Sequence, residues 1–524
     1  MWLTTIGGID WPSSYAHDGM GISQHQQQLT QMLDRLKAAG INTVLLQTRV
    51  RATTIYPSDF EPWDGCLSGR PGMSPGYDAL QFAIDECHRR GMELHAWVVT
   101  IPVGKWTSYG CQQLRRRYGY LIKKIGDEGY MNPESPVTAD YLADICGEIA
   151  RKYDVDGIHL DYIRYPETWR GYKSADHITD IVSAIHRRVK FYKPWVKLSS
   201  SPIGKYDDLS RYRSNGWNAL RRVAQDAQGW LRMGIMDQLY PMMYFQGNQF
   251  YPFAIDWQEN NYGRTIAAGL GVYMLDPREG RLRLPEVKRQ LNVTRQIGMG
   301  HCYFRAKFLL DNHQGVCDYA TWFDRQPALV PPMTWQHDVA PTAPSTLTVS
   351  HTPDGDLLAW GGARDRSDGP YLLYNIYASR ETPVDVSNPA NLIATRQLQS
   401  HLFVPYTMSG PQPASPDGRR HSLHYAVCAL DRYGNESLPR QDLTPTAPHR
   451  TSILLPCNGS ELYLATSADS PYLAVCTLQG TFVHTCDNQP IVDVSTLSEG
   501  IYELKSLSRK GVVHRLGFFI VKRH

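Results

Sequence analysis

The sequence predicts an α/β fold in which a (β/α)8 TIM barrel is followed by two small all-β sandwich domains. Apolar, β-branched runs alternate with helical patterns about eight times in the first two thirds of the chain. No Gly-x-Gly-x-x-Gly follows any of these runs, which argues against a dinucleotide-binding sheet. The last third consists of short alternating segments separated by turn residues, a pattern typical of sandwiches.

Eight apolar runs are predicted to be the barrel strands. They lie at residues 3–9, 43–47, 94–99, 157–160, 196–200, 237–244, 265–272 and 301–304. Apolar residues at helical spacing predict the intervening helices, at residues 26–39, 77–90, 139–153, 178–191, 218–233 and 285–297. Gly40 and Gly91 stop the first two helices, and Pro285 opens the last one.

The 524 residues are too many for one hydrophobic core, so several domains are expected. The barrel is predicted to span residues 1–330, and a proline-rich linker to span residues 331–344. Residues 345–447 and 448–524 are predicted to form the two sandwiches.

Composition restricts the possible partners. A net charge of only +3 gives no reason to expect nucleic acid or an anionic membrane as the partner. No stretch reaches the roughly 18 apolar residues that a membrane span needs. The cysteines form no Cys-x-x-Cys pair, so no zinc ribbon is predicted. Cys476 and Cys486 flank a turn and could form a disulfide across a hairpin. The sequence does not predict an oligomeric state.

The loop after each strand forms the functional face of a barrel, so residues at the predicted strand ends are candidates for the site. They include Asp10, Gln47, Arg49, Trp97, Asp161, Arg164, Tyr165 and Tyr244. This set contains carboxylates, an amide, guanidinium groups and aromatic rings, but no cluster of His and Cys. No catalytic metal and no cofactor are therefore expected, although His95, His159 and Asp161 could in principle supply metal ligands.

The run from Tyr153 to Pro166 is the most informative of the chain. Asp161 ends the predicted fourth strand, and Tyr162, Arg164 and Tyr165 follow at once. His159 lies two residues before Asp161, so the pleat points both side chains to the same side of the sheet. A carboxylate with an arginine and two tyrosines beside it suits carbohydrate chemistry.

Several segments resemble the bacterial glycosyl-hydrolase-like family 10 in order and spacing. They are Trp2…Asp10-Trp11-Pro12, Asn42…Arg49 with Tyr56-Pro-Ser58, Gly91…Trp97, Asn132-Pro133, Asp156…Asp161…Tyr165-Pro166, Pro241…Tyr244 and Gly269…Tyr273. The resemblance implies a barrel with a glycoside-hydrolase role, and some family members are reported to cut peptidoglycan glycan strands stripped of peptide. Residues 345–447 resemble a fibronectin type III domain, and the last segment resembles a small C-terminal β-sandwich of secreted proteins.

The resemblance also implies a location. Family members usually begin with a signal or lipoprotein peptide, whereas this chain begins inside the first predicted strand. We therefore expect a periplasmic or cell-surface protein with a shortened N-terminus. Membrane association is expected only through a missing lipoprotein signal.

Glycoside hydrolysis usually needs two carboxyl groups, and Asp161 is predicted to be the first. The simpler alternative is that Asp161 only binds sugar hydroxyls or anchors Arg164. The second carboxyl group is predicted at Glu259, after the sixth strand, with Glu167 and Asp10 as alternatives. Carboxylates at such positions are more often surface or packing groups, and this alternative holds for each of the three.

The other candidates are assigned to substrate binding, each with a structural alternative. Arg164 could hold an acidic sugar substituent or adjust the ionisation of Asp161, or it could pair with Glu167. His159 is interpreted as a neutral core histidine near Asp161. Hydroxyl binding is expected of Gln47, Arg49 and Asp10. Stacking on sugar faces is expected of Trp97, Tyr165 and Tyr244, although rings at a barrel rim often only cap the core.

Three functions fit the sequence. The first is a glycoside hydrolase that cleaves a bacterial or dietary polysaccharide, with peptidoglycan strands as one candidate. The second is a glycan-binding protein without catalysis. The third is a surface scaffold with a vestigial barrel. The substrate linkage and the choice between retention and inversion are not predicted.

Overall fold

The computed structural model describes residues 1–405 apart from 213, 215 and 353, then residues 423–442 and parts of 455–521. The chain divides into two compact units. One consists of Met1–Asp338 with Arg432–Asn435, and the other of Val339–Asp431 with Glu436–His524. No described helix is long and apolar enough to cross a membrane.

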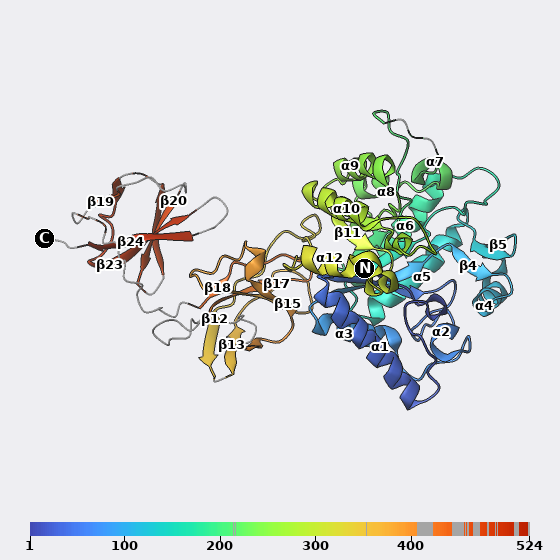
Figure 1. Ribbon diagram of the computed structural model, residues 1–524, viewed down its shortest axis with the longest axis horizontal. Helices are drawn as coiled ribbons and strands as arrows, with labels where there is room; N and C mark the ends of the chain where they lie inside the picture. The colour runs from blue at the N-terminus through green and yellow to red at the C-terminus, as the bar shows by residue number, and fades with distance from the viewer. Residues whose placement is uncertain are drawn as a thin grey trace. The chain divides into compact units, whose positions relative to one another are not determined.

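The first unit is a barrel of eight parallel strands, as the sequence predicts (Figure 1). In sheet order the strands are β1 (Trp2–Leu3), β2 (Thr43–Arg49), β3 (Glu93–Val99), β7 (Gly157–Asp161), β8 (Lys197–Ser200), β9 (Gln238–Leu239), β10 (Thr265–Leu270) and β11 (Gly300–Tyr303). Nearly all their side chains are buried, as expected of strands covered on both faces.

Helices surround the strands (Figure 1). The main ones are α1 (Gly19–Ala38), α3 (Ala79–Arg89), α5 (Pro136–Lys152), α6 (Ala175–Tyr192), α9 (Tyr251–Glu259), α10 (Leu284–Gln296) and α12 (Val316–Phe323). Local signals explain their ends. Asp18 caps α1 by accepting a hydrogen bond from the backbone N–H of Gly21. Gly40, just after α1, has a φ of +78° and lies so close to Asp324 that an added Cβ would be 2.4 Å from its Cβ atom.

The predicted helix at 218–233 is wrong as a single element. It is divided into α7 (Ala219–Val223) and α8 (Ala227–Arg232). Ala224 is left-handed, with a φ of 56°, and the side chain of Asp226 caps the second piece. The predicted strands at 3–9 and 237–244 are shorter in the structure for similar local reasons. Gly7 and Gly8 have positive φ angles, and Pro241 lacks the N–H that would continue a ladder.

Asp10 links the first and last strands of the barrel, because it binds both the loop after β1 and the segment after β11. Its Oδ2 atom accepts hydrogen bonds from the Thr4 backbone N–H at 2.8 Å and the Thr4 hydroxyl at 2.7 Å. Its Oδ1 atom accepts from the Lys307 backbone N–H at 3.0 Å and from the Arg305 guanidinium. Asp10 therefore joins the loop after β1 to the segment after β11.

An insertion follows β3 on the side where the strands end. It contains α4 (Tyr109–Tyr118) and a small antiparallel sheet of β4 (Pro102–Lys105), β6 (Glu128–Met131) and β5 (Ile122–Ile125), in that order. No helix or strand is predicted from the sequence between residues 99 and 139. This sheet supplies one wall of the pocket described below.

The second unit contains all-β modules, as predicted. The first has one sheet of β12 (Thr346–His351), β13 (Gly355–Gly361) and β16 (His401–Pro405), and another of β15 (Leu392–Gln397), β14 (Leu373–Ser379), β17 (His424–Leu430) and β18 (Arg440–Gln441). Leu358 and Trp360 from one sheet and Ile376 and Val427 from the other share one apolar core. The predicted boundary at 447/448 lies outside the described residues.

The last module has its own core around Leu473, Leu504 and Phe519. Its strands are β19 (Glu461–Tyr463), β20 (Tyr472–Thr477), β21 (Phe482–Asp487), β22 (Ile491–Asp493), β23 (Gly500–Leu507) and β24 (Val513–Val521). The suggested disulfide is wrong, because Cys476 and Cys486 are both free thiols. The register pairs Cys476 with Phe482 and Cys486 with Leu473, so the two cysteines do not face each other.

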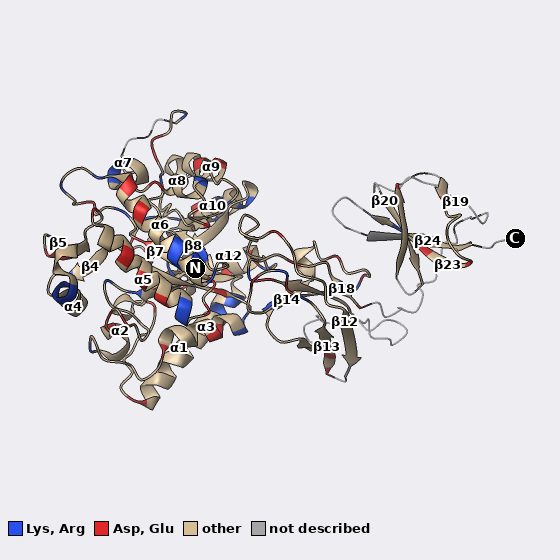
Figure 2. Cartoon of the chain, turned by 180° about the vertical axis from the view of Figure 1, so that it is seen from behind, with Lys and Arg blue, Asp and Glu red and all other residues tan. Residues whose placement is uncertain are grey.

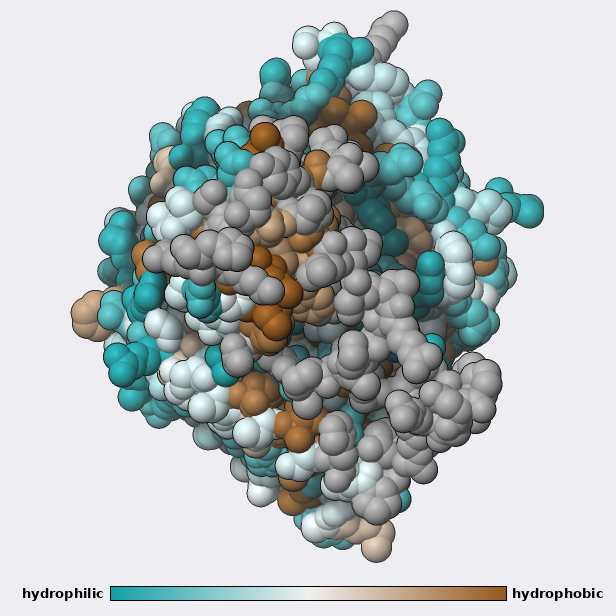
Figure 3. Space-filling view, turned by 90° about the vertical axis from the view of Figure 1, so that its left-hand side faces the viewer, coloured by the Kyte–Doolittle hydropathy of each residue, from teal (hydrophilic) through white to brown (hydrophobic). Residues whose placement is uncertain are grey.

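The surface is mixed in both charge and hydropathy. Basic and acidic residues are interspersed (Figure 2), in keeping with the small net charge of +3. The face shown in Figure 3 carries hydrophobic residues among hydrophilic ones. Exposed apolar side chains of the second unit include Tyr472, Phe482, Ile491 and Ile501.

Candidate functional site

Asp161 lies at the carboxyl end of β7 and is held by three hydrogen-bond donors. Its Oδ1 atom accepts from the Ser201 hydroxyl at 2.8 Å and the Tyr162 backbone N–H at 2.8 Å. Its Oδ2 atom accepts from the Trp97 indole N–H at 3.1 Å. The carboxyl group is therefore fixed by β3, by the residue after β8 and by its own loop. Only 5% of Asp161 is exposed.

The surroundings of Asp161 act on its pKa in opposite directions. Burial raises the pKa, because the charged form loses its hydration. The positive charge of Arg164 and the three hydrogen bonds lower it, but burial prevails and the pKa is raised overall. A raised carboxyl pKa at a barrel mouth is a feature of proton-donating groups in enzymes.

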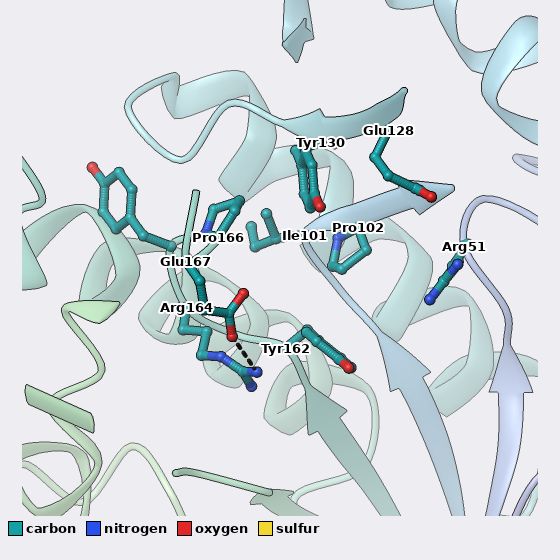
Figure 4. A pocket seen from close by; sticks show the side chains of 10 residues that line it. Arg51, Ile101, Pro102, Glu128, Tyr130, Tyr162, Arg164, Pro166 and Glu167 are labelled. Atoms are coloured by element: carbon teal, nitrogen blue, oxygen red, sulfur yellow. Dashed lines mark hydrogen bonds and ion pairs between the residues drawn. The ribbon is translucent and has the colours of Figure 1, made fainter. Parts of the chain in front are cut away.

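A pocket of about 260 Å³ lies beside Asp161, at the carboxyl end of the strands. Figure 4 shows Arg164 and Glu167 on one side of it and Arg51 and Glu128 on the other. Tyr130 and Tyr162 lie between these two sides. Asp161 does not line this pocket, but its neighbours Tyr162 and Arg164 do. The full lining consists of Arg51, Ile101, Pro102, Glu128, Tyr130, Tyr162, Arg164, Tyr165, Pro166 and Glu167.

Arg164 lines the pocket, and its positive charge acts on Asp161. It is only 6% exposed, and its Nη2 atom donates to Glu167 at 3.0 Å. The guanidinium carbon lies 4.4 Å from the centre of the Tyr162 ring. Its Nε and Nη1 atoms are buried and have no hydrogen-bond partner among the described residues. A buried guanidinium with two free donors is suited to binding an anionic or strongly polar ligand group.

Two lining residues have unusual backbone conformations. Arg51 and Tyr162 have φ angles of 55° and 53°, in the left-handed region that non-glycine residues rarely adopt. Strain of this kind tends to persist at binding and catalytic sites, where the surrounding structure enforces it. Its occurrence at two residues that line one pocket supports the pocket as the functional site.

Three residues predicted to bind substrate instead support the fold. Gln47 accepts hydrogen bonds from the backbone N–H groups of Thr5 and Ile6, at 3.0 and 2.9 Å. Arg49 is fully buried in an ion pair with Glu61 at 2.6 Å. Asp10 has four donors at the barrel seam, as described above.

Two further candidates lie in the barrel interior. His159 accepts a hydrogen bond from the Trp2 indole N–H at 3.2 Å, and its Nδ1 atom lies 3.0 Å from the Ser199 hydroxyl. Burial lowers its pKa well below the ordinary range, so it is a neutral core histidine. Trp97 is 4% exposed and donates to Asp161. It therefore orients the carboxyl group and offers no open face to a sugar.

The two tyrosine candidates differ. Tyr165 borders the pocket, but its side chain is fully buried and its hydroxyl lies 2.8 Å from Nδ1 of His177. Tyr244 packs against Phe304 and Tyr273, with ring centres 5.3 and 5.8 Å apart. As a whole residue Tyr244 is half-buried, while its hydroxyl oxygen is buried.

Glu259 is not brought together with Asp161. It is the last residue of α9, its side chain is 53% exposed, and it pairs with Arg211 at 2.6 Å. Helices of a barrel run back from the carboxyl ends of the strands, so the end of α9 lies away from the expected site. Glu167, the alternative from the sequence, does line the pocket.

Four of the polar lining residues were not identified from the sequence as binding residues. Arg51, Glu128 and Tyr130 come from loops and the inserted sheet, and Tyr162 was noted only as a neighbour of Asp161. The turn residues Gly126 and Asp127 between two short apolar segments would have indicated the hairpin. In the part of the chain that the structure describes, no three His, Cys, Asp or Glu side chains form a metal-binding group.

Comparison with known proteins shows a family and curated proteins to which this chain is similar. Residues 1–179 match the family described as Glycosyl hydrolase-like 10. The resemblance to this family is confirmed. The chain is 27% identical over 495 residues to the glycosyl hydrolase YngK of Bacillus subtilis, covering 83% of this chain and 91% of YngK.

A second curated relative is the glycosyl hydrolase DigH of Escherichia coli. It is 29% identical over 284 residues, which cover 47% of this chain and 65% of DigH. Among solved structures, an α-L-fucosidase isoenzyme 2 from Paenibacillus thiaminolyticus gives a TM-score of 0.40 at 13% identity, covering 60% of this chain and 48% of the fucosidase.

The buried Arg49–Glu61 pair gives a stability prediction. Arg49→Met leaves the Glu61 carboxylate buried without its partner, so we expect the free energy of unfolding to fall by about 3–5 kcal/mol. Arg89→Met is the control, since Arg89 pairs with Glu86 at the surface and is 62% exposed. It should change stability by less than about 1 kcal/mol. Urea unfolding followed by circular dichroism measures both, and equal losses would contradict the structural role of Arg49.

The raised pKa of Asp161 gives a pH prediction. The folded protein keeps this proton to higher pH than the unfolded chain, where the value is near 3.8. The contribution of Asp161 to the free energy of unfolding is therefore complete at pH values below 3.8, and it is lost as the pH rises through the raised pKa of the folded protein. Asp161→Asn removes this dependence, so the variant should gain stability relative to the parent protein as the pH rises. Unfolding measured across the acid range checks this, and a difference that stays constant with pH would contradict it.

Proposed function

We propose that this protein is a glycoside hydrolase whose saccharide substrate binds in the pocket at the carboxyl end of the barrel. The observation that carries the proposal is a buried, triply hydrogen-bonded Asp161 beside a pocket with carboxylates on two sides. The match to the Glycosyl hydrolase-like 10 family and the printed names of YngK and DigH support the same reaction class.

In this proposal Asp161 is the general acid. Burial raises its pKa and so favours the protonated form, and in this proposal the proton passes to the glycosidic oxygen as the bond between that oxygen and the sugar carbon breaks. The second carboxylate acts from the pocket as base or nucleophile. Glu167 suits this role because it lines the pocket and Arg164 holds it there in an ion pair at 3.0 Å. Glu128 suits it because it lines the pocket and its carboxylate makes no hydrogen bond or ion pair with another described side chain.

We propose a bacterial polysaccharide as the substrate, with peptidoglycan glycan strands as the leading candidate and dietary polysaccharides as the alternative. The free Nε and Nη1 donors of Arg164 support a saccharide that carries an acidic substituent. A site of action in the periplasm or at the cell surface accords with this substrate.

A non-catalytic glycan-binding protein is the second candidate. It is favoured by the low exposure of Asp161, 5%, and by the absence of Asp161 from the pocket lining. In this case the tyrosines and arginines of the pocket would hold a sugar without cleaving it.

The two candidates predict different results with peptidoglycan strands freed of peptide. A hydrolase releases new reducing ends, and Asp161→Asn should lower the rate by about 10²–10⁴-fold because the proton donor is lost. The control is Asp85→Asn, on the exposed surface of α3, which should retain full activity. Sugar binding without release in the parent protein would support the second candidate and remove the first.

The second carboxylate is identified with three further variants. We expect Glu167→Gln or Glu128→Gln to lower the rate by at least about 100-fold, because one of them supplies the base or nucleophile. Glu259→Gln should leave the rate unchanged, since Glu259 pairs with Arg211 at the surface. Loss of activity in Glu259→Gln alone would restore the assignment made from the sequence.

A further inference from the structure

The insertion after β3 concentrates positive charge beside the pocket. Residues 102–131 contain six basic and two acidic residues, a net charge of +4, whereas the whole chain carries only +3. Three of the basic residues lie together on α4 (Figure 2). None of the six forms an ion pair with a described residue. They are Lys105, Arg115, Arg116, Arg117, Lys123 and Lys124.

The strand register places two of these cations on the pocket face of the inserted sheet. Lys123 of β5 lies opposite Tyr130 of β6, and Lys105 of β4 lies opposite Glu128 of β6. Directly opposed residues of antiparallel strands project their side chains to the same face of the sheet. Tyr130 and Glu128 both line the pocket (Figure 4). The exposed side chains of Lys105 and Lys123 therefore extend the pocket wall beyond these two residues.

The other face of the inserted sheet is covered by α4. A Cβ atom added to Gly129 of β6 would lie 2.8 Å from the Sγ atom of Cys111 in α4. Lys124 lies opposite Gly129, so it projects to this covered face. Its Nζ atom lies 5.5 Å from the centre of the Trp106 ring, which gives Lys124 a partner within the insertion. The two neighbouring lysines of β5 thus have different surroundings.

Arg51 adds a third cation at the same wall. Its side chain passes β4 at Gly104, where an added Cβ atom would lie 3.4 Å from the Cβ and 3.7 Å from the Cδ of Arg51. Lys105 is the next residue of β4. Arg51 lines the pocket on the side of Glu128 (Figure 4) and forms no ion pair with a described residue. Three cations without a described ion-pair partner therefore border one side of the pocket.

We propose that Arg51, Lys105 and Lys123 form an accessory binding strip for an anionic polysaccharide whose chain continues from the pocket across the inserted sheet. The inference rests on the proposed hydrolase and extends it. The pocket takes the sugars next to the scissile bond, and the strip takes acidic groups of sugars further along the chain. Lysine and arginine form charge-assisted hydrogen bonds with carboxylates. Three separated cations fit a polymer whose acidic groups recur, more than a sugar with a single acidic substituent.

An anionic membrane fits this strip less well than a polysaccharide does. The strip continues the wall of a pocket, and it includes the carboxylate of Glu128 and the ring of Tyr130 between its lysines. A membrane surface would meet that carboxylate with charge of the same sign. A sugar chain can use all three kinds of group, because its hydroxyls, ring faces and acidic substituents differ in chemistry.

Binding of a long peptidoglycan strand freed of peptide tests the strip, because acidic groups recur along it. Titration calorimetry in an Asp161→Asn background prevents cleavage during the measurement. Lys105→Gln/Lys123→Gln should raise Kd about tenfold, since two charge-assisted contacts are lost. The matched control is Arg116→Gln/Lys124→Gln, which removes the same charge from exposed residues outside the strip and should change Kd less than about twofold. The same strand with its carboxyl groups reduced to alcohols should bind both double variants equally.

The outcomes separate this inference from the proposed function. An equal loss of affinity in both double variants overturns the strip, because placement then has no effect. Binding to vesicles of anionic lipid but not to the strand also overturns it, as does binding to neither. Weaker strand binding by Lys105→Gln/Lys123→Gln alone, in a protein that releases no reducing ends, supports the strip and removes the hydrolase. Release of reducing ends with unchanged affinity in that variant keeps the hydrolase and overturns the strip.

Discussion

The carboxyl group of Asp161 is the interaction on which the candidate site depends. It takes donors from β3 through Trp97, from the residue after β8 through Ser201, and from its own loop through the Tyr162 N–H. These three bonds join neighbouring strands at the edge where the barrel opens. Tyr162, which donates one of these bonds, has a left-handed backbone, and the loop that follows it brings Arg164 and Glu167 to the pocket.

Asp10 is a second buried carboxylate that accepts several hydrogen bonds, but it serves the fold and not the pocket. Its four donors come from Thr4, Arg305 and Lys307, and all its acceptor capacity is used within the fold. Asp161 keeps one acceptor position free and lies beside a pocket. The two residues illustrate why a carboxylate at a strand end is not by itself a catalytic group: the number of donors around it determines what remains for a ligand.

The fold could be predicted from the sequence because each barrel strand is an apolar run and most helices carry clear stop signals, such as Gly40. The position of Asp161 followed from the same pattern. The pocket was predicted less completely than the fold. Arg51, Glu128 and Tyr130 lie in loops and in an inserted hairpin, which hydrophobic periodicity does not reveal. Arg49 and Gln47 were assigned to ligand binding because a strand end gives no information on whether a polar side chain already has partners. Glu259 was placed near the rim because no helix was predicted after the sixth strand, whereas in the structure Glu259 is the last residue of α9.

The inserted sheet of β4, β6 and β5 has an evolutionary consequence. It contributes Pro102, Glu128 and Tyr130 to the pocket, yet none of its strands belongs to the eight-stranded sheet that forms the barrel. Lengthening or shortening its β5–β6 turn would reshape one wall while the barrel strands and the Asp161 bonds stay as they are. Related chains could thus acquire different saccharide preferences by exchanging one surface hairpin, without rebuilding the scaffold beneath it.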